Sequence, residues 1–465
     1  MVCLRAVLTY KQGGTLRLRT LLVSGAVTLG LLSSCLGTVQ ASDDPVPGAD
    51  VSVQAAVDAA PVAGDSVPAP EDLDEFSEEL DDEISLPTPE ALEDEQPTTV
   101  SETPGDDELV PDEFTAPDPQ ASALETEASC RARLAVAAAK DSDDLVPCAS
   151  WDTDTSASGM RPAANAWATP KWCGENGADG RWYVIRFKAC GVFPLNLTVI
   201  NPRTGAVVGR MHYLAVGYAY SKRDSKTWAY QVELLHVSSS GAAKGSSANG
   251  KATCEGKCDV AESKFPSQLI SASKEPVGQF FVDTTIKTSP KGQKGTGQAS
   301  AKWRFTNPTW AGPTNYVSLP TPGVRCDNAL PGTSKAGCVM PYISEMVYAK
   351  NGEFPELAAH IESAQNTKNL PGKHGTKRYL TRLTDKAMRK ENRDTACPTS
   401  LERPPGKQCD EYPFASTWQG AKTGGGKFSR RMIDGDQNED GGRALGRFYL
   451  YSRIIERDKF LMWIK

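Results

Sequence analysis

Near its C-terminus the chain reads Cys409-Asp410-Glu411-Tyr412-Pro413-Phe414-Ala415-Ser416-Thr417. Pro413 restricts the backbone, and the aromatic residues on either side of it favour packing into a core. We therefore predict that Asp410 and Glu411 project from a rigid element. The alternative is a strand end whose acidic pair only faces solvent.

A second polar cluster, at residues 434–442, reads Asp-Gly-Asp-Gln-Asn-Glu-Asp-Gly-Gly. At the start of a helix, Asn438 or Glu439 would present an oxygen to a metal, and the helix N-terminus would favour a phosphate. The two clusters together supply hard oxygen ligands for a divalent cation and a separate carboxylate for an attacking water, which metal-assisted phosphodiester hydrolysis needs. Taken alone, the second cluster is equally a solvated turn, with a helix beginning only near Gly442.

Charge is distributed unevenly along the 465 residues. Residues 42–129 hold 27 Asp or Glu and no Lys or Arg, whereas residues 130–465 hold 47 basic and 31 acidic residues, a net of +16. The acidic, Pro-rich segment cannot bury enough apolar surface to fold, so we predict that it is disordered. The basic remainder is typical of a polyanion binder, or only keeps a secreted protein soluble. The acidic segment is then a spacer, or an intramolecular inhibitor that occupies a nucleic-acid groove.

The first 41 residues are predicted to be a signal peptide. Basic residues precede an apolar run over residues 21–39, and Val39-Gln40-Ala41 offers a small-residue cleavage site. An alternative is a lipoprotein signal in which Cys35 is lipidated. No other stretch is long and apolar enough to cross a membrane, so we expect a secreted protein without a stable membrane partner.

Ten cysteines follow the predicted signal, and an even number in an exported chain indicates disulfides. A zinc site is the rival interpretation, but Cys254 and Cys258 have no partner pair or nearby His to complete it. Sequence alone does not fix the connectivity. Bridges between sequential neighbours are the simplest prediction: 130–148, 173–190, 254–258, Cys326–Cys338 and Cys397–Cys409.

The fold class predicted is a multidomain chain with a β-rich, sandwich-like domain over residues 130–320 and a small α+β domain over residues 321–465. The first has short β-branched and aromatic runs separated by turns. Its Gly/Ser/Lys-rich stretches, residues 238–251 and 289–297, are predicted to be mobile basic loops. They are plain surface loops or, alternatively, loops that contact phosphates. In the second, residues 354–364 have helical spacing.

The two clusters resemble the signature of the secreted bacterial NucA/NucB-type deoxyribonucleases over about residues 325–465. The residues that carry this resemblance are the run 409–417, then Gln437-Asn438-Glu439, Gly441-Gly442, Leu445 and Phe448-Tyr449. The resemblance implies a ββα-metal-like core, in whose relatives a His usually serves as general base and an Asn on the next helix holds the metal. None of His212, His236, His360 and His374 falls in either cluster. The resemblance therefore implies that Asp410 takes the place of that His.

Roles for the remaining residues follow from the resemblance and from general chemistry. Glu439, with help from Asn438, would hold one divalent cation, Mg²⁺ or Mn²⁺, although hard oxygen ligands also suit Ca²⁺. Glu411 would tune Asp410 or hold a water of the cation. Arg443 would stabilise developing charge, and Arg430 and Arg431 would bind the substrate phosphate, unless these are surface arginines.

The predicted function is a secreted, metal-dependent endodeoxyribonuclease with little sequence preference, acting on double- or single-stranded DNA. One alternative is a secreted DNA- or envelope-binding protein whose nuclease-like domain is inactive. Another is a toxin that delivers a C-terminal nuclease.

Overall fold

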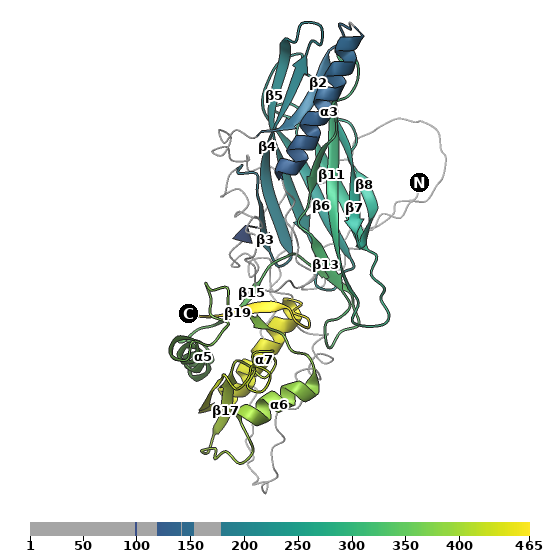
Figure 1. Cartoon of the computed structure of the whole chain (residues 1–465). Coiled ribbons are helices and arrows are strands. Elements are labelled where there is room, and N and C mark those ends of the chain that lie inside the picture. The colour runs from purple at the N-terminus through teal and green to yellow at the C-terminus, as the bar shows by residue number, and fades with distance from the viewer. Residues whose placement is uncertain (1–97, 100–118, 141, 153–177) are drawn as a thin grey trace, which may run out of the picture. The chain divides into compact units, whose positions relative to one another are not determined.

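The computed structural model describes residues 98–99, 119–140, 142–152 and 178–465 (Figure 1). The predicted signal peptide, the lipidation site at Cys35 and most of the acidic segment lie outside these residues. Helix α3 (Pro119–Ala139) begins inside the segment predicted to be disordered, so that end of the segment is helical. Among the described residues, no helix is long and apolar enough to cross a membrane.

The middle of the chain is β-rich, as predicted, and its strands form two antiparallel sheets. The first has the order β1-β3-β4-β5-β6-β10-β8, with β2 paired to β4. Its strands are β1 (Thr98–Thr99), β2 (Val146–Trp151), β3 (Trp182–Ile185), β4 (Lys188–Ile200), β5 (Val207–Tyr220), β6 (Thr227–Gly241), β8 (Cys258–Lys264) and β10 (Val277–Thr284).

The second sheet has the order β14-β13-β11-β7-β9, with β12 paired to β11. It continues beyond residue 320, where the sequence placed the end of the β-rich domain. The bridge Cys326–Cys338 therefore lies within this sheet, between paired residues of β13 and β14. Its strands are β7 (Ser247–Gly256), β9 (Gln268–Leu269), β11 (Lys294–Thr306), β12 (Val317–Pro320), β13 (Val324–Asp327) and β14 (Gly337–Val339).

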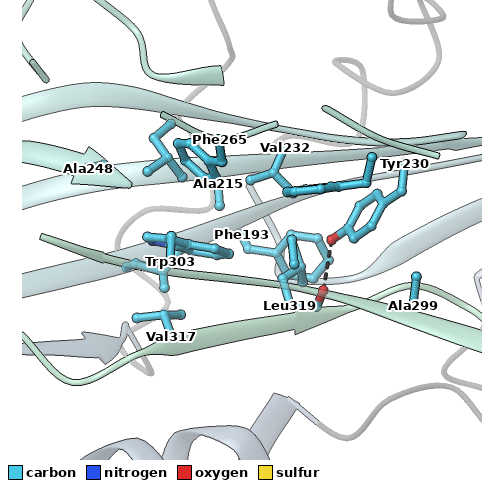
Figure 2. Close-up of a cluster of buried hydrophobic side chains, with 14 of the residues drawn as sticks. Phe193, Ala215, Tyr230, Val232, Ala248, Phe265, Ala299, Trp303, Val317 and Leu319 are labelled. Atoms are coloured by element: carbon cyan, nitrogen blue, oxygen red, sulfur yellow. Dashed lines mark hydrogen bonds between the residues drawn. The ribbon is translucent and has the colours of Figure 1, made fainter. Parts of the chain in front are cut away.

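One apolar core lies between the two sheets. Inward positions of the long strands alternate with outward ones, so Phe193 of β4 and Trp303 of β11 meet in the same cluster (Figure 2). The hydroxyl of Tyr230 donates to the carbonyl of Leu319 at 2.8 Å, which satisfies its buried polar group (Figure 2). This shared core makes the two sheets a sandwich.

The Gly/Ser/Lys-rich stretches predicted to be loops are partly strands, while residues 242–246 and 289–293 between the strands are turns or loops. β6 extends to Gly241, β7 begins at Ser247 and β11 begins at Lys294. Their inward positions hold small residues such as Ala248 and Gly297, which fit close to the core but lack the β-branched pattern that marks a strand. The prediction of loops was wrong, for this reason, at residues 238–241, 247–251 and 294–297.

The C-terminal part is α+β. A three-stranded sheet joins β15 (Ser344–Tyr348), β19 (Lys459–Ile464) and β16 (Leu380–Thr381), and a two-stranded sheet joins β17 (Lys407–Tyr412) to β18 (Ser429–Asp434). Three helices accompany them: α5 (Pro355–Thr367), α6 (Lys386–Ala396) and α7 (Gly435–Tyr451). Side chains from α5, α7, β17, β18 and β19 share one apolar cluster.

Helix α7 follows β18 directly and begins earlier than Gly442. The Asp434 side chain caps it by accepting from the backbone N–H of Gln437 at 3.2 Å. Gly441 lies inside the helix against Leu357 of α5, where a side chain would clash. The second polar cluster is thus the first turns of a packed helix instead of a solvated turn.

Four of the five predicted disulfides are confirmed: Cys130–Cys148, Cys254–Cys258, Cys326–Cys338 and Cys397–Cys409. Cys190 is disulfide-bonded as well, while its predicted partner Cys173 lies outside the described residues. The bridge at Cys409 ties β17 to the end of α6, next to Asp410 in the sequence.

Candidate active site

The hairpin of β17 and β18 divides the predicted site residues between its two faces. Side chains alternate along a strand, so Gln408 and Asp410 share a face. Register places Asp410 opposite Arg431 and Glu411 opposite Arg430, and opposed residues project to the same side. Asp410 and Arg431 therefore lie on the face that contacts α5 and α7, whereas Glu411 and Arg430 lie on the other.

Asp410 is held by a histidine that lies outside both sequence clusters. Its Oδ2 is 2.5 Å from Nδ1 of His360 on α5, and Nε2 of the same ring is 3.1 Å from Oγ of Ser429 on β18. Serine hydrolases have the same chain of hydrogen bonds from an Asp carboxylate through a His ring to a Ser hydroxyl. Here the imidazole is fully buried, whereas Asp410 keeps 5% exposure. The arrangement thus orients the carboxyl group of Asp410 through a buried imidazole.

The two adjacent carboxyl groups have different electrostatic environments. Burial raises the pKa of Asp410, and the hydrogen bond and charge of His360 partly offset this rise. Burial also raises the pKa of Glu411 to about 8, and the neighbouring charge of Asp410 adds to the rise. At neutral pH Glu411 is mostly protonated, which makes it a poor base, and Asp410 is the carboxyl group that shares a strand face with Gln408.

A glutamine connects Asp410 to the predicted metal ligands. Gln408 lies two residues before Asp410 on the same face, and its Nε2 is 2.5 Å from Oε1 of Glu439. Its Oε1 accepts from Nδ2 of Asn438 at 2.9 Å. One side chain thereby fixes both Asn438 and Glu439 of α7 beside the strand that carries Asp410.

The three predicted arginines occupy different places. Arg443 lies one turn after Glu439, with Nη1 3.8 Å from its Oε2, and it also pairs with Asp440. Arg431 is exposed, and its charge partly offsets the rise that burial causes in the pKa of Asp410. Arg430 donates to the carbonyl of Ala396 at 2.8 Å. Arg431 and Arg443 therefore lie with the oriented carboxylates, and Arg430 does not.

The donor set fits a cation that keeps most of its water. Glu439 is partly exposed and offers carboxylate oxygens near the positive end of α7, next to the amides of Asn438 and Gln408. Within the described residues, no group of three or more His, Cys, Asp or Glu is placed to hold a metal. Few hard protein ligands suit Mg²⁺, which typically binds through one or two carboxylates and retains waters.

Comparison with known proteins gives one family match in this part of the chain. The family model described as Deoxyribonuclease NucA/NucB matches residues 364–463. The C-terminal part of the chain is a NucA/NucB-type domain. No curated protein matches the chain. The matched NucA/NucB segment contains β17, β18 and α7, and it supports a nuclease role with DNA as substrate.

Sequence reasoning missed three residues of this candidate site: His360, Gln408 and Ser429. A signal for His360 was present, because it shares a helix face with Leu357, Ile361 and Ala364, and a polar group on such a face needs a buried partner. His374, which falls in neither sequence cluster, lies away from these residues in the loop before β16. It is partly exposed, stacks on Trp463 and lies 2.7 Å from a Glu345 oxygen.

Proposed function

We propose that this protein is a secreted, metal-dependent endodeoxyribonuclease that cleaves DNA with little sequence preference. The observation that carries the proposal is the position of Gln408, which bonds the predicted metal ligands Asn438 and Glu439 and shares a strand face with Asp410. In this proposal β17, β18 and α7 form the ββα-metal-like core. The disulfides support an oxidising, extracellular location.

The mechanism assigns the proton transfer to Asp410. Its carboxylate accepts a proton from the attacking water, while His360 holds the carboxyl group in one orientation through the 2.5 Å contact. Glu439 and Asn438 would hold Mg²⁺ or Mn²⁺, which would neutralise phosphate charge and stabilise the leaving 3′ oxygen. Arg431 and Arg443 bind the phosphate from the same side of the hairpin and stabilise its developing charge.

The metal ligand is tested by Glu439→Gln in the full chain. The amide keeps the size of the side chain but removes the anionic oxygen, so we expect the Mg²⁺ concentration for half-maximal plasmid cleavage to rise at least about tenfold. Cleavage rates across a Mg²⁺ or Mn²⁺ titration, with EDTA as blank, give the measurement.

Asp440→Asn is the matched control for Glu439→Gln, because that neighbouring carboxylate pairs with Arg443. Equal metal requirements for Glu439→Gln and the wild type would contradict the assignment. Binding of DNA without cleavage by the wild-type chain under any metal would favour an inactive binding protein.

The orienting role of His360 predicts a change in the pH profile. A base acts when ionised, so activity is lost as pH falls through the pKa of Asp410. His360 lowers that pKa, and His360→Gln should therefore move the acidic limb of kcat/KM to higher pH. Measuring kcat/KM from pH 5 to 9 at saturating Mg²⁺ tests this. Ser429→Ala keeps the imidazole and should leave the limb nearly in place. A variant that lost activity evenly at all pH values would show a purely structural role.

A further inference from the structure

The outer face of the second sheet of the sandwich carries three cations close together. Ala301, Trp303 and Phe305 of β11 are fully buried, so the alternate residues Lys302 and Arg304 project outward. Register pairs Lys302 directly with Lys251 of β7. We call Lys251, Lys302, Arg304 and the nearby Tyr316 the basic face.

Tyr316 holds two of these cations together. Its ring is 41% exposed. The Lys251 Nζ atom lies 5.7 Å from the ring centroid, and the Arg304 guanidinium carbon lies 5.1 Å from it. Cation–π contacts at these distances position both charges. The three cations therefore form an organised patch instead of three independent long side chains.

The positive charge of the basic face is not neutralised within the described part of the chain. None of its three cations forms a salt bridge with a described residue, and the Arg304 Nε atom has no hydrogen-bond partner there. Like charges directly opposite each other on neighbouring strands are destabilising. A bound anion that spans both strands would relieve this repulsion.

The outer faces of the two sheets differ in polarity, and only that of the second sheet carries the basic face. On the other side of the sandwich, Val192, Leu214, Val216 and Leu235 form a second buried apolar cluster. The outward positions around the basic face are instead polar, for example Asn249, Thr253 and Ser300. Hydroxyl, amide, Lys and Arg groups together are the donors that contact the phosphate backbone of nucleic acids.

We propose that the basic face is a DNA-binding surface, distinct from the candidate active site, in which Lys251, Lys302 and Arg304 bind backbone phosphates and Tyr316 positions two of them. This inference rests on the proposed function for its choice of DNA among polyanions. The surface would hold the substrate strand independently of sequence and of the catalytic metal. Through the covalent connection between the domains, it would raise the local concentration of DNA at the C-terminal domain.

The test is the salt dependence of DNA binding by the full chain with EDTA present, so that no cleavage occurs. The probe is a fluorescent 30-base-pair duplex in an anisotropy titration at several NaCl concentrations. We expect Lys251→Gln/Lys302→Gln to weaken binding roughly tenfold at low salt and to reduce the slope of log K against log[NaCl] by about two, one per phosphate contact. Tyr316→Ala should weaken binding less and keep most of the slope.

The matched control is Lys274→Gln/Lys335→Gln, which removes two exposed lysines outside the basic face. An unchanged slope for the basic-face variant, or an equal loss in the control, would overturn the proposal. The basic-face variant should also raise KM for plasmid cleavage and leave kcat unchanged. If the wild-type chain cleaves no DNA but its EDTA-resistant binding still depends on Lys251 and Lys302, the proposed function fails while the surface stands.

Discussion

Replacement of Asp410 by asparagine is expected to lower kcat for plasmid cleavage by about 10²–10⁴-fold, the usual contribution of a positioned general base. The amide preserves the volume of the side chain and leaves an oxygen toward His360, but it cannot take a proton from water. Because Glu439 and Asn438 are untouched, the Mg²⁺ requirement and the affinity for DNA should stay close to those of the wild type. Initial rates at saturating Mg²⁺, with anisotropy binding in EDTA, give both quantities.

The matched control for Asp410→Asn is Glu411→Gln, which alters the adjacent carboxyl on the other face of the hairpin. Glu411, with its pKa raised to about 8, is mostly neutral at pH 7, so the amide should change kcat much less there. A large loss in Glu411→Gln together with a small loss in Asp410→Asn would assign the base to the other carboxyl. Thermal unfolding of both variants shows whether either effect comes from misfolding, since both carboxyl groups are buried or partly buried.

Local pattern was enough to predict the rigid strand that carries Asp410, the Cys397–Cys409 bridge and the β-rich middle of the chain. Each of these depends on neighbouring residues: a proline between aromatics, two cysteines close in sequence, or alternating β-branched residues. The orientation of Asp410 depends on His360, fifty residues earlier in the chain. No spacing rule connects a strand to a helix across that distance, so only the fold brings these two side chains together.

Parts of β6, β7 and β11 were predicted to be loops because they do not have the usual composition of strands. Residues 294–301 read Lys-Gly-Thr-Gly-Gln-Ala-Ser-Ala, which is typical of a loop. In the sheet, the glycines and alanines occupy the crowded inward positions, and the polar residues face outward. Of the three cations of the basic face, Lys251 lay in a stretch predicted to be a loop, whereas Lys302 and Arg304 lay outside both such stretches.

Loss of the Arg453 guanidinium is expected to have the largest effect on stability. Arg453 follows α7 and is 1% exposed, and its Nε and Nη2 donate to the carboxylate of Asp327 in β13 at 3.0 and 2.8 Å. Asp327 is fully buried. Arg325 lies 3.3 Å from the same carboxylate and also bonds Asp458. Removing Arg453 would leave the negative charge of Asp327 with fewer positive partners in a site that excludes water.

Arg453→Met should therefore lower the free energy of unfolding by about 3–5 kcal/mol, the cost of breaking a buried ion pair from one side. Urea unfolding followed by tryptophan fluorescence measures this free energy.

Arg453→Met/Asp327→Leu removes both charges and should recover a substantial part of the loss, because no carboxylate is then left without its partner. Arg443→Met is the surface counterpart, and its exposed pair with Asp440 should contribute no more than about 1 kcal/mol. If the double variant were as unstable as the sum of the two single variants, packing of the arginine stem would account for the effect better than charge.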